Sequence, residues 1–447
     1  MTLDGMGAFD MDFAVAKPRA GQLPIFNIIK QINPLTPFSQ LDSQTVSDFA
    51  SLGSSIKNFI QSAVICWGLN SNPQIQLVLS PPAEQIFSFI DFPGFSKNSV
   101  IGVRFRKEQL FAQGTPWVYG VVQYVVPYFD TKVKSVQIDG YGILFEAQRR
   151  QNSRNFKNMS LKNIASAIVK KYGLGFTTKG PVKDSNIFEP EQNIDDFTYL
   201  NIVASKLDAN WYIEESDVVF ISNDYMYSQT PSANLLYGAM PAINTNNYFP
   251  ITEFYPEINA SVFDGGSERL TARGIDLDTG KVVEKIFEPK KPRLGSLALT
   301  SDQFRSDSGV TINARVLKPS PKFANSMESG VFVPYHSRSD ELLTYQYHVE
   351  KKDLCIRATV KTVGLPGLTP GSIVNVQGVG EILGGNYIID DLEHRMEKTA
   401  GFVTILRLTR NALGQISSAA SFKQNLNVAA GKVIGSVKSF AQKVTGI

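Results

Sequence analysis

Hydrophobic positions follow their most regular pattern in the middle of the chain, over residues 160–222. Apolar side chains recur there at helical spacing in two stretches, which predict two helices. The first stripe consists of Leu161, Ile164, Ala165, Ile168, Val169 and Tyr172, and the second of Phe197, Leu200, Val203, Ala204 and Leu207. Ser160 is predicted to cap the first helix and Gly173 to end it. Asp195 and Asp196 precede the second stripe, at the positive end of the helix dipole.

A hairpin is predicted directly after the second helix. Asn210 fits the left-handed cap that would end this helix. Apolar residues at 211–213 and 218–221 flank the polar turn Glu214-Glu215-Ser216-Asp217. Two small helices and a hairpin make an α/β module, to which we assign residues 149–225.

On both sides of this module the hydrophobic period is two. Ile75, Leu77 and Leu79 alternate with Gln74 and Gln76, and further runs at 100–105, 117–128 and 133–144 predict a first β-barrel over residues 71–148. Later runs lie at 269–276, 282–287, 355–363, 372–376, 386–395 and 401–410. They predict a second β-barrel over residues 226–415, with long loops at 226–260 and 289–345. The expected fold class is therefore α+β, mostly β, with two barrels around the α/β module.

The two ends of the chain have patterns of their own. Residues 1–42 are broken by Pro18, Pro24, Pro34 and Pro37 and are read as an irregular arm. From Ser43 the apolar positions Val46, Phe49, Leu52, Ile56, Phe59, Ile60 and Ala63 have helical spacing, so residues 1–70 are assigned to an arm and a helix. This helix either docks on a partner or packs on its own domain. Its candidate docking residues are Phe49, Ile56 and Phe59.

The last segment, residues 416–447, carries lysines and no acidic residue. Val433, Ile434, Val437, Phe440 and Val444 would form one face of a basic amphipathic helix. Three alternatives stay open for this tail: docking on a partner through Ile434, Val437 and Phe440, contact with a membrane or nucleic acid, or disorder.

Composition narrows the class of protein. The chain has 447 residues, 43% of them hydrophobic and 19% charged, with 29 Phe and 16 Tyr, which favours folded β structure over disorder. A net charge of +3 is too small to indicate nucleic-acid binding by the whole chain. We expect no membrane span and no secretory signal. The two cysteines, Cys66 and Cys355, are interpreted as buried thiols.

No catalytic, cofactor-binding or metal-ligating motif is apparent. The three histidines, His336, His348 and His394, have no partner at metal-ligand spacing. Nucleophile-elbow, dinucleotide and phosphate-loop patterns are also missing. The carboxylate pairs are Glu214–Glu215 and Asp390–Asp391, and neighbours on a strand point to opposite faces, so neither pair is expected to converge. The chain is therefore not expected to be an enzyme, and we predict no cofactor.

Several short stretches resemble the hub proteins of phage tails. The block from Asn193 to Leu200, with Trp211 and Phe220 after it, is similar to a helix-and-hairpin motif of this family, in which Tyr199 and Asn210 depart from the usual Phe-Leu and Gly-Trp. Two further stretches resemble strands of the family's second barrel. The motif residues are Asp196, Phe197, Leu200, Trp211, Phe220, Arg273, Gly274, Asp276, Gly371, Gly385, Tyr387, Arg410 and Asn411. The family comprises the late-control tail protein of P2-like phages, the T4-type baseplate hub and the N-terminal half of type VI secretion spike proteins.

The resemblance implies a structural virion protein of the tail baseplate. Three copies would form a ring of six tube-like barrels that joins a six-fold tail tube to a three-fold central spike and lines the ejection channel. The implied partners are the tail tube or tube-initiator protein, the spike, baseplate wedge proteins and the tape-measure protein, with DNA only as transiting cargo. Two alternatives stay open, a tail-associated cell-wall or polysaccharide hydrolase and a carbohydrate-binding adhesin. Whether the source is a phage or a phage-derived injector is also open.

Overall fold

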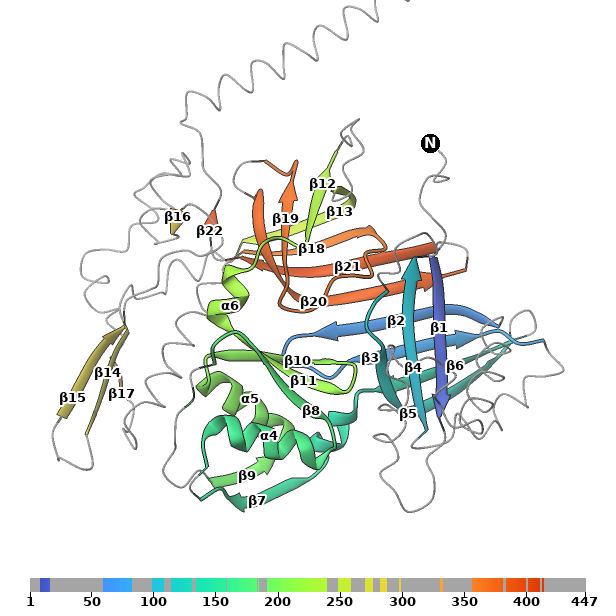
Figure 1. Ribbon diagram of the computed structural model, residues 1–447. Coiled ribbons are helices and arrows are strands. Elements are labelled where there is room, and N and C mark those ends of the chain that lie inside the picture. Colours follow the sequence, from blue (N-terminus) through green and yellow to red (C-terminus); the bar gives the residue numbers. More distant parts are fainter. Residues whose placement is uncertain are drawn as a thin grey trace, which may run out of the picture.

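The computed structural model of this chain describes residues 9–16, 59–82, 99–107, 114–130, 134–157, 159–182, 184, 191–238, 248–258, 270–275, 282–287, 297–298, 330–332, 356–380, 383–398, 401–410 and 412–413. These residues are mostly β-strand, with a few short helices (Figure 1). No helix among them has the length and apolar character needed to cross a membrane.

The N-terminal strands form one antiparallel run in the order β1-β4-β5-β6-β3-β2. Their bounds are β1 Phe9–Ala16, β2 Ile60–Gly68, β3 Gln74–Leu79, β4 Val100–Lys107, β5 Val118–Phe129 and β6 Lys134–Tyr141. The predicted alternation in β3 is confirmed, because Ile75, Leu77 and Leu79 are buried while Gln74 and Gln76 are exposed. No pairing among the described residues closes this run into a barrel, so a first barrel stays a prediction.

A second group of six strands does close into a barrel, in the order β20-β19-β12-β13-β18-β21 with β21 returning to β20. The bounds are β12 Ala233–Tyr237, β13 Tyr248–Ile258, β18 Ile356–Val363, β19 Ile373–Gln377, β20 Gly385–Glu397 and β21 Gly401–Arg410. Closure removes the unpaired strand edges that an open sheet would expose.

Strand β20 joins the two groups because it has three partners. Its first residues pair with β19, its later residues pair with β2, and β21 pairs along its other edge. A register shift between Ile389 and Asp391, at the point where the partner changes, bends the strand. The N-terminal run and the barrel therefore form one continuous ladder of strands.

Between these groups in sequence lies a compact unit with three α-helices and one 3-10 helix among its described residues. Its elements are a 3-10 helix Ile143–Gln148, β7 Gln151–Asn155, α4 Leu161–Lys171, β8 Gly175–Lys179, β9 Glu191–Asp195, α5 Asp196–Lys206, β10 Ala209–Glu214, β11 Asp217–Ser222 and α6 Asn223–Ser228. Strands β10, β11 and β8 form one small sheet, and β7 pairs with β9. Figure 1 shows this unit below the barrel and beside the N-terminal strands. The two predicted helices and the hairpin are confirmed as elements.

Local sequence explains where these helices begin and end. The Ser160 hydroxyl accepts a hydrogen bond from the Asn163 N–H, and the Asp195 carboxylate accepts one from the Thr198 N–H, as helix caps do. Gly173, at φ +64°, follows α4 as predicted. The predicted cap at Asn210 is wrong, because Asp208 takes the left-handed conformation (φ +52°) and Asn210 lies within β10.

The β10–β11 hairpin separates two hydrophobic cores. Trp211 and Phe220 face the core shared with α4 and α5, whereas Tyr212, Val219 and Ile221 face the core shared by the N-terminal strands and the barrel. Both faces of the hairpin are thus covered, which explains the unbroken apolar runs of its strands.

Three predictions about the chain's organisation are wrong where the structure describes the residues. Ile60 and Ala63 belong to strand β2 and not to a helix, because β2 pairs with both β3 and β20. Within the predicted irregular arm, β1 pairs with β4. Within the predicted loop at 226–260, α6, β12 and β13 form instead. The earlier helix residues, Phe49 and Ile56 among them, and the tail at 416–447 lie outside the described residues.

Additional short strands lie between β13 and β18 in sequence and shortly after β21. They are β14 Leu270–Ile275, β15 Val282–Phe287, β16 Leu297–Ala298, β17 Gly330–Phe332 and β22 Ala412–Leu413. The antiparallel pair β14–β15 confirms the predicted strands on either side of Asp278-Thr279-Gly280. Most of the predicted loop at 289–345 lies outside the described residues.

Candidate functional site

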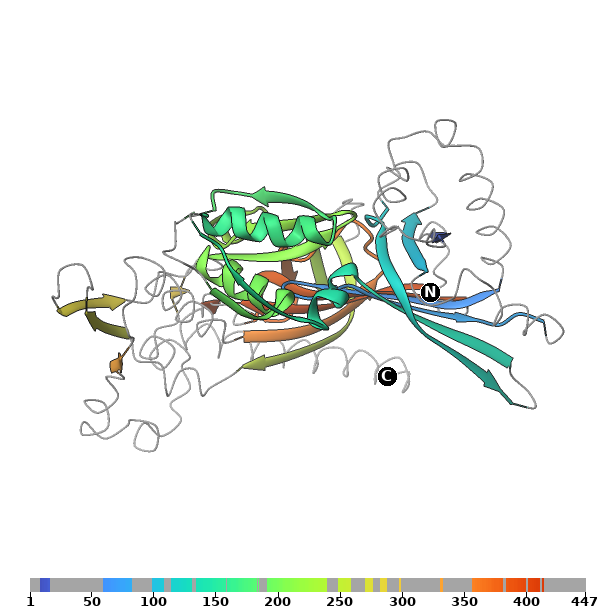
Figure 2. The ribbon, with the colours of Figure 1, turned by 90° about the horizontal axis from the view of Figure 1, so that it is seen from below.

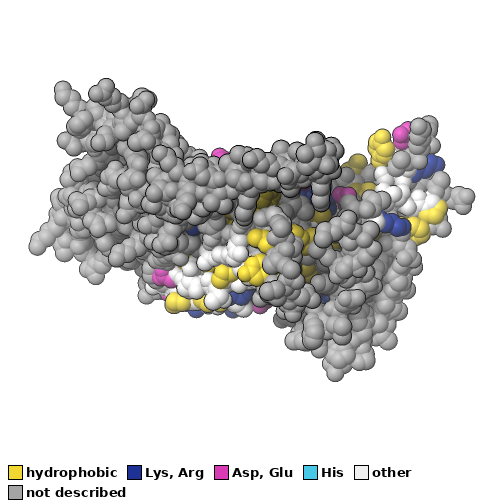
Figure 3. Space-filling view, turned by 90° about the horizontal axis from the view of Figure 1, so that it is seen from above, with side chains coloured by type: hydrophobic (Ala, Val, Ile, Leu, Met, Phe, Trp, Pro, Cys, Tyr) yellow, Lys and Arg dark blue, Asp and Glu magenta, His cyan; other side chains and the backbone are white. Residues whose placement is uncertain are grey.

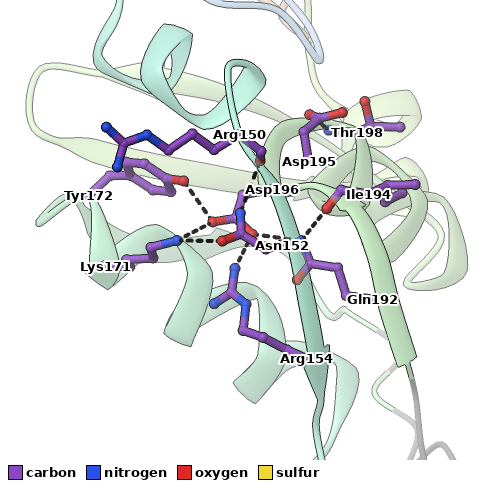
Figure 4. A network of polar contacts seen from close by, with 10 residues as sticks. All are labelled: Arg150, Asn152, Arg154, Lys171, Tyr172, Gln192, Ile194, Asp195, Asp196 and Thr198. Atoms are coloured by element: carbon purple, nitrogen blue, oxygen red, sulfur yellow. Dashed lines mark hydrogen bonds and ion pairs between the residues drawn. The ribbon is translucent and has the colours of Figure 1, made fainter.

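The motif residue Asp196 is the centre of a buried polar network at the start of α5. Its carboxylate is fully buried and accepts hydrogen bonds from Lys171 Nζ (2.9 Å), the Tyr172 hydroxyl (2.6 Å) and Gln192 Nε2 (2.6 Å), and it pairs with Arg154. Figure 4 shows these donors converging from β7, the end of α4 and β9. One carboxylate therefore ties four elements together.

The network holds Asp196 in its ionised form. Burial alone would raise the pKa of this carboxyl, but hydrogen bonds from Tyr172, Gln192 and Lys171 and the charge of Arg154 outweigh it, so the pKa is lowered. The pKa of Tyr172 is raised by burial and by its bond to the same carboxylate. A fully buried carboxylate whose oxygens are taken by donors has no room for substrate, so this site serves the structure.

The other residues of the first motif pack around the same helix. Phe197 and Trp211 meet edge to face with their ring centres 5.5 Å apart. Trp211 is fully buried and donates its Nε1–H to Asn201 at 2.7 Å. Leu200 and Phe220 are also fully buried. The structure therefore brings Asp196, Phe197, Leu200, Trp211 and Phe220 together around α5 and the hairpin.

A chain of amides links this unit to the N-terminal strands, and the sequence analysis missed it. Asn70, in the turn between β2 and β3, donates to Asn210 Oδ1 (2.6 Å), and its own Oδ1 accepts from the Trp211 N–H (3.1 Å). Asn210 donates to Asn223 (2.8 Å), which donates to Asp208 (2.7 Å). The members are 140, 13 and 15 residues apart, so no local pattern could have indicated them.

Three residues of the second motif group, Gly385, Tyr387 and Arg410, meet at one end of the barrel. Arg410 is buried, donates to the Gly384 carbonyl (2.5 Å) and lies over the Tyr387 ring at 5.3 Å. Gly385, at φ +131°, leaves the space that this guanidinium occupies, because a Cβ there would lie 2.7 Å from Arg410 Nη2. Gly371 (φ +76°) is in the turn before β19.

The structure describes the remaining predicted site residues only in part. Arg273 and Gly274 lie in β14, where the structure describes the backbone, and Asp276 and Asn411 lie outside the described residues. Phe59 is half-buried in the turn before β2, and its carbonyl accepts from the Ser80 N–H. Ile434, Val437 and Phe440 are outside the described residues.

Three acidic residues of the β10–β11 turn line one cavity, which the sequence analysis did not predict. Glu214, Glu215 and Asp217 line this cavity of about 680 Å³ together with Arg104, Thr115, Thr177 and Thr369, and Glu214 also pairs with Lys179 at 3.0 Å. Glu215 has φ +54° in the hairpin turn, so the alternation of an extended strand does not apply to it. Burial raises the pKa of Glu215. The pKa of Asp217 is raised by burial and by the negative charge of Glu214. Among the described residues no group of three potential ligands could hold a metal ion.

Comparison with known proteins identifies a fold. No family model matches the chain, and no characterised protein matches it by sequence. A tail protein from Neisseria meningitidis MC58 is similar in structure, with a TM-score of 0.53 and 11% identity over 79% of this chain and 93% of that one. The 43 kDa tail protein of prophage MuSo2 from Shewanella oneidensis has a TM-score of 0.53 and 10% identity over 90% of this chain and 100% of its own. The chain therefore has the fold of phage tail proteins.

Proposed function

We propose that this chain is a structural protein of a phage tail or a phage-derived injector, located in the baseplate as a hub. The observation that carries the proposal is the likeness in fold to a prophage tail protein, which covers 90% of this chain and 100% of that protein. The buried Asp196 network supports a role in holding shape, because its oxygens are occupied by donors.

In the proposed assembly, three copies form a ring that joins the tail tube to the central spike. The closed barrel would supply one tube-like unit, and the N-terminal strands, closed by contacts with neighbouring chains, would supply the other. The proposed domains are a first barrel of residues 71–148 with β1 and β2 from residues 1–70, the α/β module (149–225), the second barrel (226–415) and the tail (416–447). The tube or tube-initiator protein, the spike, wedge proteins and tape-measure protein are the proposed partners, with DNA passing through the ring.

Native mass tests this function directly. Light scattering of the purified chain is expected to give roughly 148 kDa, three times the chain mass of 49.3 kDa, and electron microscopy should then show a ring with pseudo-six-fold symmetry. If the chain alone is a monomer, the measurement is repeated with a candidate spike protein. A monomer under both conditions would overturn the hub proposal.

A second candidate function follows from the cavity beside the β10–β11 turn. Paired carboxylates are the catalytic groups of most glycoside hydrolases, and Glu214, Glu215 and Asp217 line this cavity together. We propose a cell-wall or polysaccharide hydrolase as the alternative. Loss of turbidity in purified peptidoglycan, abolished by Glu215→Gln, would support it, whereas a folded ring without this activity would remove it.

A further inference from the structure

One end of the β5–β6 hairpin projects beyond the rest of its sheet. Strand β4 pairs with β5 only at residues 118–121, and β3 pairs with β6 only as far as Val136. Strands β5 and β6 continue to pair until Phe129 meets Lys134, so in the described structure the ladder has two strands at residues 128–129 and 134–135. Figure 2 shows this ribbon extending away from the molecule. We call residues 124–129 of β5, with their partners 134–139 of β6, the hairpin end.

The hairpin end exposes large apolar side chains. Tyr124, Val126, Tyr128 and Phe129 are 56%, 49%, 57% and 49% exposed, whereas residues 118–122 of the same strand are buried. Figure 3 shows hydrophobic side chains beside charged ones at this projecting end. Tyrosine and phenylalanine are enriched in the centres of protein interfaces, where each contributes a large contact area at a small entropic cost.

From this surface we propose that the hairpin end docks on a second copy of this chain. The proposal rests on the proposed ring, in which a closed set of identical chains needs a contact between two different surfaces of each chain. A ribbon that reaches past its own core supplies one of these surfaces.

The size and charge of the surface favour a second copy. At roughly 200 Å² per aromatic side chain, the half-exposed residues present on the order of 400 Å², about half of what one partner buries in a stable interface. In a ring each chain gives its hairpin end to one neighbour and receives that of the other, so each chain takes part in two such contacts. In the sequence Asp130, Lys132 and Lys134 border the hairpin end with a net charge of +1, short of the cluster of about four to eight basic residues that binds an anionic membrane.

The contact is expected to use side chains more than strand addition. Pro127 lies within the exposed part of β5 and has no N–H, so a further strand added along this edge would lack a hydrogen bond there. The apolar side chains at 124, 126 and 128 share one face of the strand because they are two residues apart.

The test compares self-association of two variants by sedimentation velocity. The triple variant Tyr124→Ser, Tyr128→Ser, Phe129→Ser should weaken self-association about 100-fold or more, because buried aromatic anchors dominate interface energies. The matched control, Tyr237→Ser with Tyr255→Ser, removes two aromatics that are 50% and 63% exposed on the barrel and should leave it unchanged. Thermal unfolding checks that both variants remain folded.

A photoreactive phenylalanine at position 128 makes the test direct. Irradiation should yield covalent dimers and trimers of this chain. An oligomer of the same mass in the wild type and the triple variant, without crosslinks, would overturn the hairpin contact and leave the hub proposal intact. Crosslinked dimers without a trimer would support the contact and count against the three-fold ring. A wild-type monomer at all concentrations, with and without the spike protein, would overturn both.

Discussion

Asp196 joins more elements than its position at the start of α5 requires. Its neighbour Asp195 performs the capping, while Asp196 accepts bonds from Lys171, Tyr172 and Gln192 and pairs with Arg154. Replacing a buried carboxylate leaves its donors without a charge to compensate them. The two adjacent aspartates therefore have separable roles, capping for one and cross-linking for the other.

We predict that Asp196→Asn lowers the free energy of unfolding by about 2–4 kcal/mol, measured by urea denaturation at pH 7. The control Asp195→Asn keeps a good capping residue and should change it by only a few tenths of a kcal/mol. Because the pKa of Asp196 is lowered in the fold, its contribution is present above the unfolded pKa of about 3.9 and is lost as pH falls through the lower folded value. Equal effects of the two variants would contradict this division of roles.

His394 also destabilises the fold in acid, but over a higher pH range than Asp196. The side chain is fully buried between Phe105 and Phe402, Nδ1 is 3.0 Å from the Thr404 hydroxyl, and burial lowers its pKa to about 3. Since the unfolded chain binds a proton near pH 6.5 and the folded chain does not, stability falls as pH drops below 6.5 and continues to fall until about pH 3.

The expected loss for His394 between pH 6.5 and pH 5 is about 1–2 kcal/mol. In His394→Asn, whose amide can still meet Thr404, this part of the pH dependence should vanish even though the variant starts from a lower stability. Unfolding curves at several pH values measure it. An unchanged slope in the variant would assign the acid response to other groups.

Among the elements, the turn between β2 and β3 fixes the sheet to the helical unit. Asn70 has φ +53° and bonds with both Asn210 and the Trp211 backbone. Asn70→Gly keeps the backbone conformation and loses the side-chain bonds, which we expect to cost about 1–2 kcal/mol. Asn70→Ala also forces a left-handed alanine and should cost about 1 kcal/mol more. Denaturant unfolding of both variants separates the loss of the side-chain bonds from the backbone strain. Equal free energies of unfolding for Asn70→Ala and Asn70→Gly would contradict the left-handed turn.

The sequence predicted those elements whose pattern is local. Helices α4 and α5 and the β10–β11 hairpin carry their periodicity, caps and turn within a few residues. Strand β2 was wrongly predicted as a helix because Phe59, Ile60 and Ala63 also fit helical spacing. It forms a strand because it pairs with β20, which is distant in sequence. Strand β13 was missed because Pro250 and Pro256 argue against a strand between two neighbours.

The candidate site was predictable to a similar extent. Asp196 was identified through its motif, but its donor Arg154 lies 42 residues away and no local signal marks it. The cavity lined by Glu214 and Glu215 was missed, because a turn residue with positive φ breaks the alternation on which the prediction relied. The sequence pattern therefore could not predict contacts that depend on tertiary packing.

At the scale of the whole molecule, two surfaces compete to explain how copies of this chain associate. The hairpin end exposes large apolar side chains, whereas the tail at 416–447 carries Lys423, Lys432, Lys438 and Lys443 and no acidic residue. Contacts between exposed charges are screened within about 8–10 Å at physiological salt and weaken further at higher salt. Burial of apolar area does not weaken in this way and gives a negative heat capacity change.

Salt therefore distinguishes the two. If the hairpin end holds the copies together, raising NaCl from 0.1 M to about 1 M should leave the oligomer's dissociation constant within a few-fold, and dilution calorimetry at several temperatures should show a positive heat capacity change on dissociation. A chain ending at residue 415 should associate equally well. Should the tail make the contact instead, high salt and the truncation would each dissociate the oligomer, while the triple serine variant of the hairpin end would remain assembled.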